Sequence, residues 1–412
     1  MGITLKAKYL GTFAFGLIWA FEAGAASVPA GTQIELRLTS EVSSEKPAGQ
    51  AVSGVVIAPV LVNGTLMIGS GTQVDGVTAD AHADKPAADG AAEQPATVRM
   101  QLTKIHDKAG QSKAVSCVVA GIDNARESVD QSGLIAGITA SQTFSALADQ
   151  GVNKVLEKNS GLGQLLSGIK GSIVKQANPA IDYKPGVELT VKLTQPLDWN
   201  APSNAKLPPA VQPEDQLKAL ISQLPYRTVA LKPPSPSDMT NVLFIGTKEQ
   251  VEQAFKDAGW FVSEPLGGAS SYHTAQAIIE NRGYNEAPMS ILTLDGKPPD
   301  LTYEKQNNTF ASRHHIRLWQ MPQTFEGKPV FVAAGTHDIK IYFSETSRSI
   351  SHGIDPNIDN ERTKVTNDMV FTGKVQAVSL IDRTNIPKDI SNATGDKLQT
   401  DDKIAAIEFQ SK

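Results

Sequence analysis

The sequence predicts a multidomain protein: an all-β, barrel-like N-terminal domain that carries a helical-hairpin insertion, followed by an α+β C-terminal domain. Three observations support this fold class. The 412 residues suffice for two or three domains of about 150 residues each. Short apolar runs broken by glycine and proline fill residues 30–130, which is typical of barrels and sandwiches. After a segment with nine prolines at 196–240, strand and helix patterns alternate.

The first 26 residues have the pattern of an export signal. Lys6 and Lys8 precede the apolar run Tyr9–Phe21, and the small residues AGA follow at 23–25. This run of 13 residues spans about 20 Å as a helix, less than a bilayer core of about 30 Å. We therefore expect a cleaved signal peptide over 1–26 and an exported chain, periplasmic or associated with the outer envelope. No later stretch reaches about 18 apolar residues, so we expect no membrane span after cleavage.

Composition excludes several function classes. The net charge is −5, from 38 basic and 43 acidic residues, so we expect no nucleic-acid partner. A single cysteine, Cys117, excludes an intrachain disulfide framework and a cysteine-rich zinc module. It lies in the apolar run AVSCVVAG, which favours a buried hydrophobic residue over a nucleophile.

Residues 27–197 are expected to form the N-terminal domain. In GTQIELRLTS, Ile34, Leu36 and Leu38 alternate with polar residues, which predicts a half-buried strand. Asn63-Gly64 stands between two apolar runs and is a strong hairpin signal. Further strand signals lie at 96–105, 113–121 and 187–194.

Two segments interrupt the strand pattern. Residues 133–180 are rich in Ala, Gly, Leu and Ser, with helical spacing in parts, so we expect a helical hairpin inserted into the β-domain. Each glycine weakens it by about 1 kcal/mol relative to alanine. Residues 198–238 are expected to be a proline-rich linker, with one short amphipathic helix near 214–223.

Residues 239–385 are expected to form the α+β domain, with a C-terminal tail at 386–412. The apolar run NVLFIG predicts a buried strand, and Thr247 with Gln250 forms a capping box that opens a helix. Asp355-Pro356 predicts another helix, with Asp355 as its N-cap. A further helix is expected at 271–281, and further strands at 260–262, 290–294, 312–320, 330–334, 339–343 and 374–380.

Two family resemblances follow from these patterns. GQAVSGVVIAPV, LMIGSGTQVDGV and NPAIDYKPGVELTVKL, with the inserted Gly/Ala-rich segment, resemble the β-domain of TrbI-type conjugal-transfer and type IV secretion proteins over about 30–197. The chain lacks their inner-membrane anchor and long proline-rich rod, so only the fold is implied. RHHIRLW, THD, SHGIDPNIDNER and LTYEK resemble the LssY C-terminal domain over about 225–381. That resemblance implies a bacterial envelope setting and no known activity.

Histidines gather in the C-terminal half. Strand alternation in RHHIRLW places His314 on the core-facing side, and His337 has the parity of its apolar neighbours. A hairpin near 323–327 sets the two strands side by side, so both rings are expected on one face. His352 precedes the helix that Asp355 is expected to cap.

This arrangement suggests a divalent-metal site, because imidazole and carboxylate together suit zinc, iron or manganese. The candidate ligands are His314, His337 and His352, with one or two of Asp338, Asp355 and Asp359. In the alternative interpretation each histidine is a hydrogen-bonded core or hinge residue, Asp355 only caps the helix, and Asp359 pairs with Arg362. No dense metal motif such as HExxH is present.

An anion site is the second hypothesis, because guanidinium groups hold phosphate or carboxylate in paired contacts. The candidate residues are Arg313, His315 and Arg317, which share one strand face, and Arg362. The alternative is a solvated basic face with cross-strand ion pairs to Asp338 or Glu304.

These patterns favour an exported cell-envelope protein with a binding or assembly role and a polar His/Asp/Arg pocket. The expected partner is an envelope protein or an outer-membrane component. The alternative is a metal-dependent hydrolase that acts on phosphorylated envelope material, with the histidines as ligands and the arginines holding the anion. No GxSxG, Walker or GxGxxG motif occurs, so the sequence contains no established catalytic signature.

Overall fold

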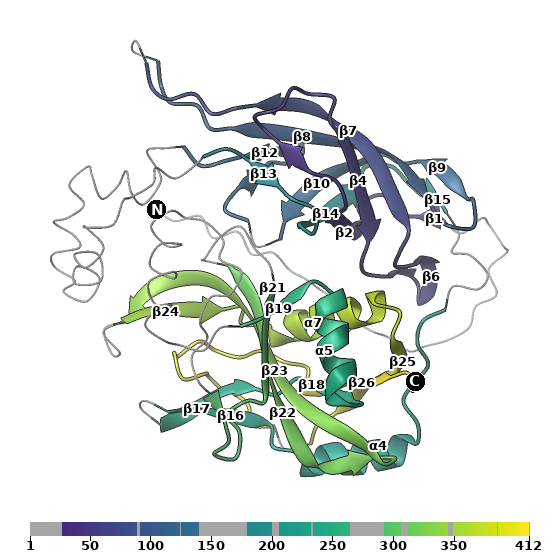
Figure 1. Cartoon of the computed structure of the whole chain (residues 1–412), viewed down its shortest axis with the longest axis vertical. Helices are drawn as coiled ribbons and strands as arrows, with labels where there is room; N and C mark the ends of the chain where they lie inside the picture. The colour runs from purple at the N-terminus through teal and green to yellow at the C-terminus, as the bar shows by residue number, and fades with distance from the viewer. Residues whose placement is uncertain are drawn as a thin grey trace.

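The computed structural model describes residues 27–88, 91–123, 125–139, 179–199, 206–231, 234–263, 292–305, 312–344, 349–384 and 386–411. For 340–344 and 349–352 only the backbone is described. The described residues are mostly β, with a nearly closed, barrel-like N-terminal sheet and an α+β C-terminal region, which confirms the expected fold class (Figure 1). The expected signal peptide, the helix at 271–281 and nearly all of the helical insertion lie outside the described residues. None of the described helices is long and apolar enough to cross a membrane.

The N-terminal half is built on one large antiparallel sheet with the strand order β10-β14-β2-β4-β7-β8-β12-β11, and β9 pairs with β8. Short pairs β1–β15, β3–β13 and β5–β6 complete it. The strands are β1 Ser27–Val28, β2 Gln33–Leu38, β3 Val42–Ser43, β4 Ala51–Val56, β5 Val60–Val62, β6 Thr65–Ile68, β7 Gln73–His82, β8 Thr97–His106, β9 Ser112–Ala114, β10 Cys117–Ile122, β11 Ser128–Val129, β12 Leu134–Ala136, β13 Asp182–Tyr183, β14 Glu188–Leu193 and β15 Leu197–Asp198.

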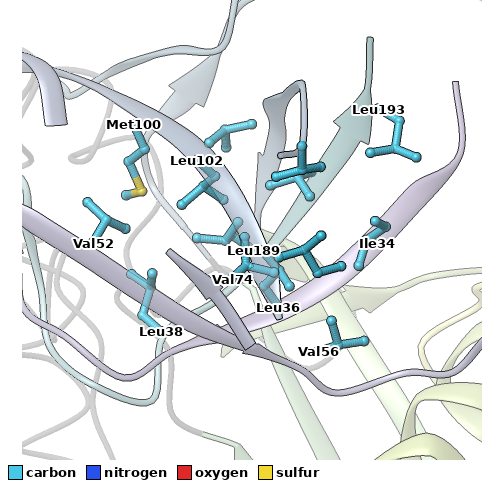
Figure 2. Packing of buried hydrophobic residues seen from close by; sticks show 14 of the residues in the cluster. Ile34, Leu36, Leu38, Val52, Val56, Val74, Met100, Leu102, Leu189 and Leu193 are labelled. Atoms are coloured by element: carbon cyan, nitrogen blue, oxygen red, sulfur yellow. The ribbon is translucent and has the colours of Figure 1, made fainter. Parts of the chain in front are cut away.

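The alternation predicted for β2 is present. Ile34, Leu36 and Leu38 are buried and pack into one apolar cluster with side chains of β4, β7, β8 and β14 (Figure 2). A fully buried aliphatic side chain stabilises a fold by about 1.5–3 kcal/mol. The hairpin predicted at Asn63-Gly64 joins β5 to β6, and both residues have positive φ, as a two-residue turn between twisted strands requires.

The C-terminal half is built on a second sheet with the order β19-β21-β22-β23-β18-β26-β25, and β24 pairs with β23. Only β18 and β26 are parallel. A small sheet β17-β16-β20 lies outside it. The elements are α4 Glu214–Gln223, β16 Arg227–Leu231, β17 Pro234–Met239, β18 Val242–Ile245, α5 Lys248–Asp257, β19 Trp260–Val262, β20 Leu292–Thr293, β21 Leu301–Lys305, β22 Arg313–Phe325, β23 Lys328–Ser344, β24 Ser349–Ile354, α7 Ile358–Phe371, β25 Val375–Asp382 and β26 Lys403–Phe409.

Helices cover both faces of this second sheet. Helices α5 and α7 pack on one face, against Phe244 and Ile316, and α4 packs on the other, against Leu243 and Trp319. Figure 1 places α5 and α7 between the second sheet and the N-terminal half. The junction of the two halves is therefore formed by the N-terminal sheet on one side and by these helices on the other.

Some boundaries differ from the sequence expectations. The two strands expected at 330–334 and 339–343 are one continuous strand, β23. Within the expected linker, 198–238, the short helix expected near 214–223 is present as α4, whereas β16 and β17 are strands that were not expected. The expected tail contains β26, which pairs with both β18 and β25.

Helix α7 begins two residues later than predicted, so Asp355 as its N-cap is wrong. The N-cap is Asn357, whose side chain accepts a hydrogen bond from the Asp359 amide. The Asp355 carboxylate instead accepts from the Asn357 amide and from the Asn360 side chain, which orders the turn before the helix. The predicted capping box of α5 is confirmed, with both Thr247–Gln250 hydrogen bonds formed.

Candidate functional site

Strands β22 and β23 place two histidines directly opposite each other. His314 pairs in register with His337, so the two side chains share one face of the sheet, as expected. Their rings stack with centroids 4.0 Å apart and planes 21° apart. The hydroxyl of Ser312 lies 3.0 Å from Nε2 of His337. The hairpin thus delivers two imidazoles to the face of the sheet that carries α7.

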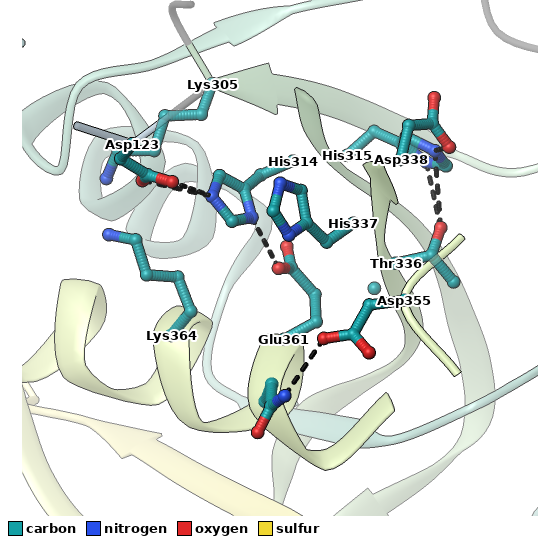
Figure 3. Close-up of polar contacts among 12 residues, drawn as sticks. Asp123, Lys305, His314, His315, Thr336, His337, Asp338, Asp355, Glu361 and Lys364 are labelled. Carbon is teal, nitrogen blue, oxygen red and sulfur yellow. Dashed lines mark hydrogen bonds and ion pairs between the residues drawn. The ribbon is translucent and has the colours of Figure 1, made fainter. Parts of the chain in front are cut away.

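His314 lies between two carboxylates from distant parts of the chain (Figure 3). Its Nδ1 is 2.5 Å from Glu361 Oε2, on α7. Its Nε2 is 3.1 Å from both oxygens of Asp123, which follows β10 in the N-terminal half. The His314 side chain is 6% exposed, and the Asp123 side chain is 26% exposed. One imidazole therefore connects the two halves of the molecule.

The two stacked rings differ in protonation. Burial by itself lowers the pKa of His314, because it disfavours the charged ring. The two carboxylates, Glu361 and Asp123, have the larger combined effect and raise that pKa to about 10. Burial and the adjacent charged His314 lower the pKa of His337 to about 4. His314 is thus an imidazolium that donates from both nitrogens, beside a neutral imidazole. Such divergent pKa values in adjacent groups are typical of functional sites.

A network of five charged groups lies beside this centre. Arg37 and Glu188 come from the N-terminal half, and Lys305, Lys364 and Asp368 from the C-terminal half. Each of the three cations lies within 4 Å of both carboxylates, the longest separation being 3.6 Å for Arg37–Asp368. Asp368 is fully buried and also accepts a hydrogen bond from the Trp260 indole. The junction is therefore strongly polar, and removal of any one member leaves buried charge behind.

A cavity of about 240 Å³ opens at the junction, next to both groups. Asp123, Glu188 and Lys364 contribute to its wall, together with Glu35 and Thr190 of the N-terminal sheet. Burial is the main reason why the pKa of Glu35 is raised. The remaining wall is formed by Ile57, Gly121, Ile122 and Leu189. The wall of the cavity therefore contains charged groups of both signs as well as apolar side chains.

The anion-site residues Arg313, His315 and Arg317 share one face of β22, as predicted, but this face is buried. Arg313 donates to Asp338 at 3.0 Å and lies 3.4 Å from Glu304. Asp338 and Glu304 are the ion-pair partners expected in the alternative interpretation. The ion pairs are buried, however, and not exposed to solvent as that interpretation expected.

The other two members of this face also have partners. His315 Nε2 is 2.9 Å from Asp338 and its ring contacts the Thr336 hydroxyl, while Arg317 lies 3.6 Å from Asp238 of β17. The small sheet β17-β16-β20 covers part of this face of β22, because its strand β17 places Asp238 beside Arg317.

Arg362, the fourth anion candidate, belongs to a different cluster. It contacts Asp401 through two nitrogens at 2.7 and 3.1 Å, and Asp359 at 2.8 Å. Within the described part of the chain, no hydrogen bond or ion pair joins it to Arg313, His315 or Arg317. The Asp359–Arg362 pair matches the structural alternative rather than a metal ligand.

The predicted metal ligands are only partly brought together. Among the described residues, one group of His, Asp or Glu side chains has ligand atoms that all lie within 4.8 Å of one another, and it contains Asp123, His314 and His337. Asp338 pairs with Arg313 and His315, and Asp355 orders the turn before α7. The Asp359 carboxylate accepts from Arg362, the Thr400 hydroxyl and the Asp401 amide. The His352 side chain lies outside the described part of the structure.

Asp123 and Glu361 are the residues that sequence reasoning missed. Asp123 follows a predicted strand, and a polar residue at a strand end is common. Glu361 stands in the conspicuous SHGIDPNIDNER motif, but its role depends on α7 facing β22. A single sequence carries no signal for contacts between segments so far apart.

Comparison with known proteins gives a family match and a weak similarity to a solved structure. Residues 224–404 match the family model described as LssY C-terminus. No curated protein matches the chain. Among solved structures, ComB10 of the Com type IV secretion system of Helicobacter pylori is 12% identical, with a TM-score of 0.22 over 42% of this chain and 90% of that chain. That similarity is too low to assign a function. The family match covers the strands and the helix that hold His314, His337 and Glu361, so residues 224–404 of this chain are similar to the LssY C-terminal domain family.

Proposed function

We propose that this chain is an exported cell-envelope protein that binds a small oxyanion-bearing ligand, a carboxylate or a phosphate ester, at the junction of its two halves. The observation that carries the proposal is the cavity of about 240 Å³ lined by both halves. Ligand pockets commonly lie at such junctions and combine apolar walls with a few polar groups.

Lys364 at the cavity wall gives an anionic group a cationic partner, and two further cations lie in the adjoining network. The five-residue network contains three cations, Arg37, Lys305 and Lys364, against two carboxylates. The wall also carries three carboxyl groups: Glu188 belongs to the network, Asp123 pairs with His314, and burial raises the pKa of Glu35. We therefore place the oxyanion against Lys364, whose carboxylate partners Glu188 and Asp368 also contact Arg37 and Lys305.

Hydrogen-bond donors are available to hold that anion. The Lys364 ammonium group uses two of its three hydrogens on Glu188 and Asp368. Its third hydrogen and the Thr190 hydroxyl supply donors at the cavity wall. Ile57, Ile122 and Leu189 leave room for a short apolar portion of the ligand. Charge-assisted hydrogen bonds of this kind stabilise a complex by about 1.5–3 kcal/mol each.

Ligand binding is tested by calorimetry on the purified chain 27–412. The probes are acetate, lactate, inorganic phosphate and glycerol phosphate, which separate carboxylate from phosphate recognition. We expect saturable binding of one class, weakened about tenfold in Thr190→Val because a hydrogen bond to a charged group is lost. Thr65→Val, at an exposed position, is the matched control. Absence of binding by all four probes, or equal binding by Thr190→Val, contradicts the proposal.

The envelope location rests on the N-terminal pattern and on the envelope setting that the family resemblance implies. Cell fractionation followed by N-terminal sequencing tests it. We expect the protein in the envelope fraction with a new N-terminus near residue 27. Recovery from the cytoplasm with residues 1–26 intact contradicts an exported function.

A metal-dependent hydrolase acting on phosphorylated envelope material is the second candidate function. The observation that favours it is the position of Asp123, which belongs to the His/Asp group and also lines the cavity. A metal-bound water and a phosphate ester would then meet in one place. Release of phosphate from glycerol phosphate by the wild type, and none by Asp123→Asn, is the expected signature of this activity.

A further inference from the structure

We propose that Asp123, His314 and His337 form a site for a divalent transition metal, zinc or iron(II), that links the two halves of the chain. This site is separate from the proposed oxyanion site, although the two share the Asp123 wall. It does not depend on the identity of any cavity ligand.

The geometry of the three side chains carries the proposal. One nitrogen of each imidazole and one oxygen of Asp123 lie within 4.8 Å of one another. Zinc bonds to nitrogen and oxygen are about 2.0–2.2 Å long, so ligand atoms bound to one ion are separated by about 3–4 Å. Because the two rings stack with planes 21° apart, their nitrogen lone pairs run nearly parallel, and one ring must turn about χ2 for both nitrogens to face one ion.

The two histidines are held by the sheet rather than by a loop. They form a register pair on β22 and β23, and their ring centroids are already 4.0 Å apart. His314 is almost fully buried and His337 is half-buried. Rigid elements that fix ligands before binding reduce the entropy lost when the ion arrives.

Glu361 completes the arrangement from behind His314. Its Oε2 lies 2.5 Å from Nδ1, so Nδ1 donates its hydrogen to Glu361 and the Nε2 side of the ring faces Asp123. A carboxylate that holds the far nitrogen of a histidine fixes the ring and its tautomer in many metal sites. The second oxygen of Glu361 is buried and makes no hydrogen bond within the described structure, so this side chain is held mainly by His314.

Binding is a simple exchange of a proton for an ion. The Nε2 hydrogen that His314 donates to Asp123 is released to solvent, and bonds from Nε2 and from a carboxylate oxygen to the ion take its place. No group is oxidised or reduced. Glu361 keeps its hydrogen bond to Nδ1 throughout.

The donor set selects the class of ion. Two imidazoles and one carboxylate suit zinc or iron(II), whereas calcium and magnesium prefer sites made of oxygen atoms alone. Because Asp123 also lines the cavity, remaining coordination positions on that side are open to water or to a ligand.

The test is metal analysis of the untagged chain 27–412, purified without chelators and also reconstituted with zinc or iron(II). We expect about one ion per chain in the wild type and its loss in His337→Gln and Asp123→Asn. His82→Gln, at an exposed position, is the matched control and keeps the ion. Glu361→Gln is expected to bind 10–100-fold more weakly rather than not at all.

Cobalt(II) substitution tests coordination directly, because a purely structural role of Asp123, His314 and His337 produces no absorption of coordinated cobalt. Visible absorption bands of coordinated cobalt are expected in the wild type and are expected to be absent from Asp123→Asn, even where circular dichroism shows an unchanged fold. Thr190→Val separates the two proposals, because it weakens the oxyanion site and leaves the metal content unchanged. Less than about 0.1 ion per chain after reconstitution, or equal affinity in wild type and His337→Gln, overturns the metal site.

Discussion

Asp123 and His314 are 191 positions apart in sequence, yet both carboxylate oxygens of Asp123 lie 3.1 Å from Nε2 of His314. This contact joins a strand end of the N-terminal sheet to the β22–β23 hairpin in the region that matches the LssY C-terminal family model. Because His314 is also held by Glu361 of α7, the same imidazole fixes the helix, the sheet and the other half of the chain. The functional proposals concern this junction.

The first prediction concerns the five-residue network. Lys305→Met is expected to lower the free energy of unfolding by about 3–5 kcal/mol, because it leaves the buried Glu188 and Asp368 with fewer counter-charges. Urea denaturation measures the change. Lys113→Met, which removes an exposed pair with Asp198, serves as control and is expected to change stability by less than about 1 kcal/mol. An equal loss of unfolding free energy in Lys305→Met and Lys113→Met would show that the network is no more important for stability than an exposed ion pair.

The second prediction concerns acid stability. Burial by itself raises the pKa of Asp368, but Lys305, Lys364 and Arg37 outweigh it and hold that pKa well below its usual value. A lowered folded-state pKa gives stability that is complete above the unfolded pKa of about 4 and is lost as the pH falls below it. We therefore expect the free energy of unfolding to decrease steeply below about pH 4.

Asp368→Asn tests the origin of that acid sensitivity. The variant is expected to be less stable at neutral pH and to show a shallower decrease between about pH 5 and pH 2, because its amide does not titrate. Asp198→Asn, at an exposed position, is the control and is expected to retain the wild-type slope. An unchanged slope in Asp368→Asn means that other carboxylates dominate acid unfolding.

The paired histidines were predictable because the signal is local. Alternation in RHHIRLW and in the strand after the hairpin determines which side chains share a face, and a short turn limits the register. The same alternation grouped Arg313, His315 and Arg317 correctly. It gave no information on their burial, since that depends in part on Asp238 and the small sheet, which come from another segment.

The carboxylate partners of His314 were not predictable for a physical reason. Asp123 and Glu361 approach His314 only after two separate sheets and α7 have packed, and neither residue has a periodic pattern that indicates a partner. The N-cap of α7 was predicted wrongly for a different, local reason. Both Asp355 and Asn357 are good N-cap residues, and the choice between them depends on how the chain leaves β24.

The third prediction concerns Arg362, which connects α7 to the segment before β26. Its two contacts with Asp401, at 2.7 and 3.1 Å, depend on the planar guanidinium group. Arg362→Lys preserves the charge but not the paired geometry, so we expect a loss of about 1–2 kcal/mol in unfolding free energy. Wild-type stability in Arg362→Lys would mean that the charge alone holds this helix in place.

The fourth prediction concerns the close approach of β7 and β8. A Cβ atom at Gly76 would lie 2.0 Å from the Gln101 carbonyl oxygen and 2.6 Å from the Leu102 Cα, and both contacts are with backbone. The register of the two strands also shifts at Asp75/Gly76, so this glycine permits an irregularity that a side chain blocks. Gly76→Ala is therefore expected to destabilise the N-terminal sheet by about 3 kcal/mol or more.

Gly121→Ala is the matched control for that substitution, because a Cβ atom there meets no atom within 4 Å. Gly121 lies on β10 of the same sheet, so the comparison holds the surrounding fold constant. We expect Gly121→Ala to change the unfolding free energy by less than about 1 kcal/mol, and thermal unfolding of the two variants measures the difference. Similar midpoints for both variants would show that β7 and β8 separate enough to admit a methyl group, and the tight pairing of these strands would then not be required for the fold.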